Sequence, residues 1–104
     1  LTKVLIANHG GDHTIYPDCR PEFIKAIDAA AYAGTFVNAH VEAPYTHITK
    51  GDIAHIGKRL GLNYAETWSC YKGADKHCGR CGTCIERKEA LTEAGIDDTT
   101  EYEE

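Results

Sequence analysis

The cysteine spacing in the second half of this chain constrains it more than any other feature. Four of the five cysteines lie in the stretch TWSCYKGADKHCGRCGTC, residues 67–84. The pattern C-x7-C-x2-C-x2-C is formed by Cys70, Cys78, Cys81 and Cys84. A two-residue spacing lets two thiolates reach one ion from a tight turn, and we expect Gly79 and Gly82 to relieve backbone strain there. Four thiolates make a closed tetrahedral set, so the pattern predicts one structural Zn²⁺ per chain.

Other uses of the same residues stay open at this point. Disulfides suit an exported domain, an iron–sulfur cluster also takes four thiolates, and a C-x2-C pair can carry thioredoxin-like redox chemistry. His77, beside Cys78, could replace one thiolate as a ligand. His9 and His13 raise the possibility of a second metal site, although the glycine-rich loop between them favours a role in a loop or substrate pocket. Because Cys84 stands at the start of a predicted helix, the helix dipole is expected to favour its thiolate.

The predicted elements alternate as strand, helix, strand, helix, which is typical of a parallel α/β sheet. The apolar run 3–8 predicts a strand, and Pro21 fits the first position of a helix that ends at Gly34. A second strand is expected over 35–44, with the apolar residues Phe36, Val37 and Val41. Ligands of such sheets gather at the carboxyl ends of the strands, so the stretch 9–20 is expected to lie at a binding site.

The rest of the chain predicts two more helices. The first runs from Thr49 to Gly61 with an apolar stripe formed by Ile53, Ile56 and Leu60. The second follows the cysteines, begins with a capping box of Thr83 and Glu86, and ends at Gly95. The final stretch DDTTEYEE is acidic and is expected to be mobile.

Composition limits the possible partners. The chain has 104 residues, at most one domain's worth, and a net charge of -5, which argues against a broad nucleic-acid-binding face. No apolar run approaches the length of a membrane span, and we expect a cytoplasmic protein with no membrane and no direct nucleic-acid partner. A local basic cluster near the cysteines either offsets thiolate charge or forms a phosphate-binding rim; it comprises Lys72, Lys76, Arg80, Arg87 and Lys88. The chain contains no methionine and begins with leucine, which suggests an excerpt of a longer protein.

The stretch YPDCRPEF, residues 16–23, places three residue types suited to ligand binding within five positions, at an expected sheet–helix junction. Tyr16 offers an apolar face, Asp18 an acceptor for N–H groups, and Arg20 a cation for a carboxylate. We therefore predict that these three bind substrate. The alternative is that Asp18 and Arg20 pair with each other or cap the helix after Pro21. Cys19 is expected to be a small packing residue, not a nucleophile.

Two motifs together resemble the 7-cyano-7-deazaguanine synthase family of the queuosine and archaeosine pathway. They are YPDCRPEF and TWSCYKG…CGRCGTCIERKEA, residues 67–90, and their order and separation also match. The resemblance runs through most of the chain. It implies the C-terminal part of a Rossmann-like parallel sheet of the adenine nucleotide α-hydrolase type, with an appended four-cysteine zinc knuckle and helix.

The resemblance also implies an ATP-dependent C–N ligase that serves tRNA modification. Such enzymes convert 7-carboxy-7-deazaguanine and ammonia to 7-cyano-7-deazaguanine with ATP and Mg²⁺. Each subunit carries one structural zinc, whose ligands map here onto Cys70, Cys78, Cys81 and Cys84. The resemblance further implies a homo-oligomer of the full-length enzyme.

The chain departs from the family pattern in two places. The ATP-binding loop S-G-G-x-D-S is not among these residues, so the chain alone is expected to be inactive and its catalytic residues stay unassigned. Thr14 and Ile15 stand where smaller residues are expected, at the edge of the substrate site.

These patterns predict three regions. Residues 1–66 form the C-terminal portion of the sheet domain with part of the substrate site, residues 67–96 a zinc-binding subdomain, and residues 97–104 an acidic tail. The alternative is a split enzyme half, or a stand-alone zinc-knuckle module that binds a protein or nucleic acid without catalysis. The acidic balance and the α/β order argue against the module.

Overall fold

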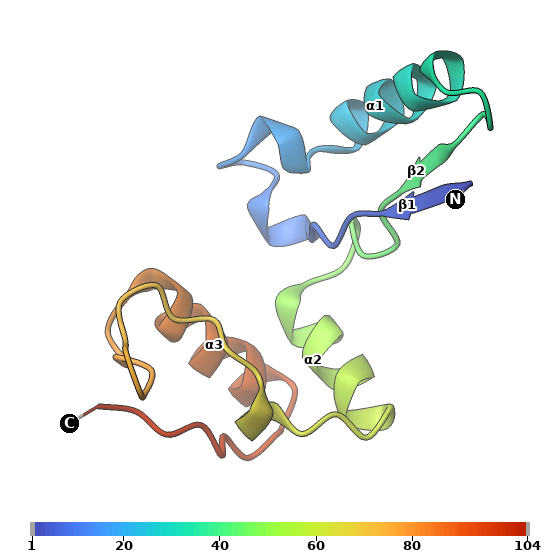
Figure 1. Ribbon diagram of the computed structural model, residues 1–104. Helices are drawn as coiled ribbons and strands as arrows, with labels where there is room; N and C mark the ends of the chain where they lie inside the picture. The colour runs from blue at the N-terminus through green and yellow to red at the C-terminus, as the bar shows by residue number, and fades with distance from the viewer. Residues whose placement is uncertain (1, 104) are drawn as a thin grey trace. The chain divides into compact units, whose positions relative to one another are not determined.

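The computed structural model describes residues 2–103 and divides the chain into two compact units, residues 1–50 and 51–104. The helices and strands, labelled in Figure 1, are β1 (Lys3–Leu5), α1 (Pro21–Gly34), β2 (His40–Glu42), α2 (Lys50–Arg59) and α3 (Gly82–Glu93). Short 3-10 helices cover Gly10–Asp12, Pro17–Cys19 and Tyr64–Glu66. The expected α/β character of a small parallel fold is confirmed. The region boundaries expected at 66/67 and 96/97 stay a prediction.

The first unit is built on a parallel pair of strands. β1 and β2 pair in the register Val4 opposite Val41, and Figure 1 shows them side by side with α1 as the connection between them. Asp28 of α1 fastens the helix to the second strand, because its Oδ1 accepts the backbone N–H of Val41 at 2.7 Å and lies 2.9 Å from Nδ1 of His40. α1 starts with Pro21 at its first position and ends at Gly34, both as expected.

The second strand is shorter than the sequence suggests. Phe36 and Val37 are exposed residues of the turn after α1, and only 40–42 pair with β1. Asn38 explains the difference, since its φ of 52° places it in the left-handed region, which breaks an extended run. Its side-chain amide also donates to the carbonyl oxygen of Tyr32 at 3.0 Å, which holds the turn against α1.

The first unit leaves much apolar surface uncovered. All three residues of β1 are exposed, and α1 has no fully buried residue. The exposed apolar side chains include Val4, Leu5, Phe23, Ile27 and Tyr32. A two-stranded sheet with a single helix cannot bury both of its faces, and parallel sheets are normally covered on both.

The second unit begins with α2. Its end is marked by Gly61, whose φ of 83° allows a left-handed C-terminal cap, as expected. The expected apolar stripe is only partly correct: Ile53 and Ile56 are half-buried, whereas Leu60 is 81% exposed. Leu60 follows the last helical residue, Arg59, so it no longer shares the buried face of α2.

α3 starts two residues earlier than the sequence predicts. Its N-cap is Cys81 and it begins at Gly82, so Thr83 lies inside the helix and the expected capping box with Glu86 is wrong. The N-cap position is taken by Cys81, whose side chain makes no capping hydrogen bond. The stop at Gly95 is confirmed, with φ 69° and a hydrogen bond from Ile96 N to Leu91 O of 2.9 Å.

The last residues of the second unit lie against the cysteine loop. An isolated parallel β-bridge joins His77 to Tyr102: His77 N donates to Glu101 O at 3.2 Å, and Glu103 N donates to His77 O at 2.8 Å. The acidic final stretch, which the sequence predicts to be mobile, is thus hydrogen-bonded to the cysteine loop over its described residues. Of the helices among residues 2–103, none has the length and apolar character that crossing a membrane requires.

Candidate metal centre

The four predicted cysteines come together in the second unit. Their sulfur atoms all lie within 4.8 Å of one another, and Cys70, Cys78 and Cys84 are buried, while Cys81 is half-buried. Cys84 is fully shielded from solvent. All five cysteines are free thiols, so the disulfide alternative is wrong. Four converging sulfurs form a donor set that could hold one metal ion.

Two tight turns bring Sγ of Cys70 and Sγ of Cys78 within hydrogen-bond distance of backbone N–H groups. Sγ of Cys70 accepts the N–H groups of Lys72 at 3.3 Å and Gly73 at 3.0 Å. Sγ of Cys78 accepts those of Arg80 at 3.3 Å and Cys81 at 3.2 Å. In each turn the donors stand two and three residues after the cysteine. N–H donors aimed at sulfur stabilise a thiolate, which is the form that binds metal.

The glycines of the second turn differ in their roles. Gly79 has a φ of 75°, a left-handed conformation that the turn after Cys78 requires. Gly82 has no positive φ and lies at the first position of α3, so the expectation that it relieves strain is wrong.

The protonation tendencies of the thiols differ within the cluster. The hydroxyl of Thr83, 3.2 Å from Sγ of Cys81, and nearby backbone N–H groups lower the pKa of Cys81 to about 5. The backbone N–H of Cys78, followed by those of Lys72 and Gly73, lowers the pKa of Cys70.

Burial raises the pKa of Cys84 to about 12, and this effect is larger than any stabilisation of the thiolate at the helix start. A metal ion would have to displace that proton, because only a thiolate serves as a ligand.

His77 does not belong to the metal-ligand set. Its Nε2 accepts the backbone N–H of Ser69 at 3.2 Å, and its ring packs on the indole of Trp68 with the ring centres 4.2 Å apart. Burial lowers the pKa of this imidazole, and the charge of Arg87 adds to the effect. Within the described part of the chain, the cysteine group is the one cluster of potential ligands that can converge on an ion.

His9 and His13 are engaged elsewhere, so the second metal site that they suggested is not supported. Nε2 of His9 lies 3.1 Å from Asp12, and Nε2 of His13 lies 3.4 Å from the hydroxyl of Thr46.

Arg87 supports the cluster through the chain that surrounds it. It is buried in α3, where its guanidinium donates to the carbonyl oxygen of Tyr64 at 2.7 Å, the hydroxyl of Thr67 at 2.8 Å and that of Thr100 at 2.9 Å. Lys88 donates to Gly79 O at 3.0 Å. Two of the five expected basic residues thus support the loop and are not available for a phosphate rim.

The residues predicted to bind substrate lie in the first unit, close together in sequence. Tyr16 and Asp18 are exposed. Nε of Arg20 donates to the carbonyl oxygen of His13 at 2.6 Å, and no ion pair joins Arg20 to Asp18 within residues 2–103. Arg20 is the N-cap residue of α1, but its side chain does not cap the helix, so neither alternative role of this pair is observed.

Sequence reasoning missed the residue that holds this stretch in place. Asn8, at the end of the first strand run, is buried, and its amide nitrogen donates to Cys19 O at 2.7 Å and to the hydroxyl of Thr46 at 3.1 Å. The carboxyl ends of parallel strands are where ligands gather, so a polar residue directly after a strand is the signal that could have identified it.

The family comparison covers almost the whole chain. Residues 1–95 match the family model described as "Queuosine biosynthesis protein QueC". A relative from Porphyromonas gingivalis, named 7-cyano-7-deazaguanine synthase, is 63% identical over 103 residues, which are 99% of this chain and 47% of the relative.

Two further relatives carry the same name. The one from Caldicellulosiruptor bescii is 52% identical over 97% of this chain and 46% of its own length. The one from Brucella ovis is 55% identical over 97% of this chain and 44% of its own length. The chain therefore spans about half the length of the curated relatives that it matches, and it belongs to the queuosine biosynthesis protein QueC family.

Proposed function

We propose that this chain is the zinc-bearing C-terminal portion of an ATP-dependent ligase that converts 7-carboxy-7-deazaguanine and ammonia to 7-cyano-7-deazaguanine. The observation that carries the proposal is the extent of similarity to relatives named 7-cyano-7-deazaguanine synthase, at 52% to 63% identity across nearly all of the chain. The names of these relatives support a synthase of this base, and the resemblance of the two motifs supports the use of ATP.

We assign zinc to the cysteine cluster on the chemistry of its donors. A zinc–sulfur distance of about 2.3 Å in a tetrahedron requires sulfurs about 3.8 Å apart. Sγ of Cys81 lies 3.9 Å from Sγ of Cys70, which suits a single ion better than a larger iron–sulfur cluster. With four thiolates there is no open coordination position, so the ion would supply a cross-link of the fold and not a reactive centre. A visible absorbance that depends on iron would overturn this assignment.

We propose that Tyr16, Asp18 and Arg20 of the first unit bind the substrate. Tyr16 is 53% exposed and can offer its ring to a planar base, while exposed Asp18 can accept from an exocyclic amine. The terminal nitrogens of Arg20 have no hydrogen-bond partner within residues 2–103, and the bond from Nε to His13 fixes the direction of the side chain. A fixed guanidinium whose two terminal nitrogens are free to donate is suited to a bidentate contact with a carboxylate.

We propose that β1 and β2 are part of a larger, Rossmann-like parallel sheet in the full enzyme. The exposed apolar faces of β1 and α1 support it, because such surface is normally covered by further strands and helices. We propose that ATP with Mg²⁺ binds in a part of the enzyme beyond these residues, and that the full enzyme is a cytoplasmic homo-oligomer.

A chimeric enzyme tests the proposed function. This chain would replace the matching half of the Porphyromonas gingivalis relative, to which it is 63% identical. We expect ATP-dependent formation of 7-cyano-7-deazaguanine, measured by mass spectrometry, and no product from the 104-residue chain alone. A folded, zinc-loaded chimera without product would contradict the proposal.

The same chimera tests the substrate residues. Arg20→Lys should raise KM for the carboxylate substrate more than it lowers kcat, because a lysine cannot make the bidentate contact. Arg80→Lys is the matched control, since its side chain is exposed beside the cysteine loop. An unchanged KM in Arg20→Lys would remove Arg20 from the substrate site.

A further inference from the structure

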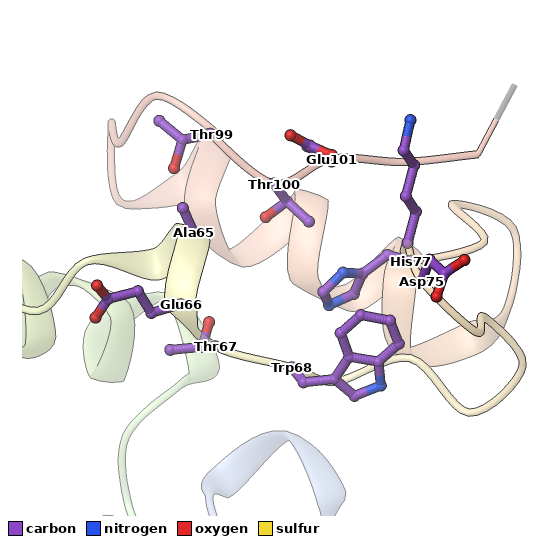
Figure 2. Close-up of a pocket in the computed structure, with 10 residues that line it drawn as sticks. Ala65, Glu66, Thr67, Trp68, Asp75, His77, Thr99, Thr100 and Glu101 are labelled. Carbon is purple, nitrogen blue, oxygen red and sulfur yellow. The ribbon is translucent and has the colours of Figure 1, made fainter.

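A buried acceptor without a hydrogen-bond partner follows β1 in the first unit. It is Oδ1 of Asn8, a residue that is 8% exposed, and no other buried side-chain nitrogen or oxygen of the described residues lacks a partner. Figure 2 shows the cavity beside the cysteine loop, and none of the residues that line it has such an atom. An unpaired buried acceptor costs stability, so one beside a binding site indicates a ligand that donates to it.

The direction of this oxygen is fixed by the other half of the amide. Nδ2 of Asn8 donates to Cys19 O at 2.7 Å and to the hydroxyl of Thr46 at 3.1 Å. A backbone carbonyl can only accept, so turning the amide over would lose that hydrogen bond and bring two acceptors together. Oδ1 is therefore a preorganised acceptor, and a ligand that donates to it costs the protein little freedom.

Hydrogen bonds link Asn8 to the arginine that we propose for the substrate carboxylate. The carbonyl group that accepts from Nδ2 belongs to the peptide bond directly before Arg20. Nε of Arg20 donates to His13 O at 2.6 Å. Nε2 of His13 lies 3.4 Å from the hydroxyl of Thr46, which also accepts from Asn8. These contacts form a closed ring, so the position of Oδ1 is coupled to that of the guanidinium.

The packing around this oxygen favours a small ligand. Oδ1 is shielded from solvent, and the segments that follow Asn8 and Thr46 pack closely. Gly10 N donates to Ile48 O at 2.7 Å, and a Cβ atom at Gly10 would lie 3.2 Å from the same oxygen. A molecule the size of a base could reach Oδ1 only by parting these segments, whereas one the size of water needs a slight shift of one loop.

The chemistry of the acceptor favours a neutral N–H donor. An amide oxygen accepts hydrogen bonds and carries no net charge. Transfer from water to a buried site costs an ion much more than a neutral molecule, so such a site selects ammonia over the ammonium ion. Ammonia that donates one N–H keeps its lone pair free, and this lone pair makes it a nucleophile.

Resting on the proposed function, we propose that Asn8 forms the binding site of the nitrogen donor, with Oδ1 accepting one N–H of ammonia. The ring of hydrogen bonds places this site next to Arg20 and hence next to the carboxylate that ammonia must reach. The base itself is held by the exposed residues Tyr16 and Asp18 and does not contact Oδ1.

Nuclear magnetic resonance tests the binding without any need for activity. The three asparagines are the only residues with side-chain amides, because the chain contains no glutamine, so Asn38 and Asn63 serve as internal controls. Ammonium chloride is titrated into the zinc-loaded, ¹⁵N-labelled chain at mildly alkaline pH, with sodium chloride as the reference salt. We expect a saturable shift of the Asn8 amide signals with the ammonium salt alone. No saturable shift at Asn8, or the same shift with sodium, would overturn the site; a bound water gives this result.

Kinetics of the chimera locate the contact. Asn8→Leu keeps the approximate shape and removes the acceptor, so KM for ammonium should rise about tenfold while KM for the carboxylate substrate stays the same. Unfolding would lower kcat and would not raise one KM alone. Asn63→Leu, at an exposed position of the second unit, is the control and should leave both KM values unchanged.

The outcomes separate this site from the proposed function. If the chimera makes product and Asn8→Leu raises only KM for the carboxylate substrate, Oδ1 faces the base and the ammonia site is wrong. An unchanged KM for ammonium in an active Asn8→Leu chimera contradicts the site as well. If the folded chimera makes no product while the Asn8 signals still respond to ammonium, the proposed function fails and the ammonia site stands.

Discussion

The guanidinium of Arg87 donates to the carbonyl oxygen of Tyr64 across 2.7 Å and thereby joins α3 to the segment that leads into Cys70. The same side chain reaches the hydroxyls of Thr67 and Thr100. One buried cation therefore holds three parts of the second unit that are distant in sequence. Loss of this side chain would remove charge-assisted hydrogen bonds from all three acceptors, although the carbonyl oxygen of Tyr64 would still accept from the N–H and the hydroxyl of Thr67.

Replacement of this arginine tests that role. Arg87→Lys should destabilise the zinc-loaded chain by roughly 2–3 kcal/mol, since an ammonium cannot reach all three acceptors. Urea unfolding followed by Trp68 fluorescence gives the free energy of unfolding. Arg80→Lys, at an exposed position of the cysteine loop, should change it little. Equal stability of the two variants would argue against the bridging role of Arg87.

Removal of one thiol tests the metal centre. Cys81→Ser should abolish stoichiometric zinc binding and lower the melting temperature, because metal binding and folding of such loops are coupled. The measurements are elemental analysis and thermal unfolding with and without zinc. Cys19→Ser, in the first unit, should keep about one zinc per chain. Unchanged melting of Cys81→Ser would show that the cluster does not support the fold.

The first turn of the loop has a steric requirement at Gly73. A Cβ atom there would meet the backbone carbonyl of Lys76, and the N–H of Gly73 is one of the donors to Cys70. Gly73→Ala should therefore weaken zinc affinity about 10- to 100-fold, as expected when a partner of a metal ligand is displaced. A competition titration with a chelator measures the change. Gly82→Ala is the control, because its Cβ would have open space in α3; an equal loss there would contradict the steric explanation.

The stability of the first unit should depend on acid through Asp28. The N–H of Val41, followed by the side chain of His40, lowers the pKa of this carboxyl. A lowered folded pKa means that the contribution is present above the unfolded value of about 3.9 and is lost as the pH falls through the folded value. Asp28→Asn should thus lose stability at neutral pH, and its difference from the unmodified chain should shrink in acid. Chemical unfolding at several pH values measures the effect, with Asp97→Asn in the second unit as the control.

Local signals predicted part of this structure. The cysteine spacing, Pro21 at a helix start, and glycines at helix ends are short-range patterns, and each determines backbone geometry within a few residues. The apolar residues Phe36 and Val37 favour a strand that begins before its observed start at His40, because the left-handed Asn38 ends the extended run. Apolar character alone does not report a turn.

Long-range contacts could not be predicted in the same way. Asn8 gains its role only because the fold brings Cys19 and Thr46 to it, and Arg87 because Tyr64 and Thr100 surround it. Their partners have no fixed spacing in the sequence. The acidic composition of the last residues predicts a mobile end and gives no sign that Tyr102 packs against the cysteine cluster.

The bridge between His77 and Tyr102 has a consequence for biosynthesis. The four thiols leave the ribosome before Tyr102 does, because they precede it in the chain. The turns that present the first sulfurs close over short loops and need no distant residue, so we expect the nascent loop to take up metal first. The later residues then cover the loaded loop. Metal would then enter the loop readily during synthesis and would exchange slowly once the later residues cover it. A chain that ends before Thr99 should therefore release zinc to a chelator faster than the complete one.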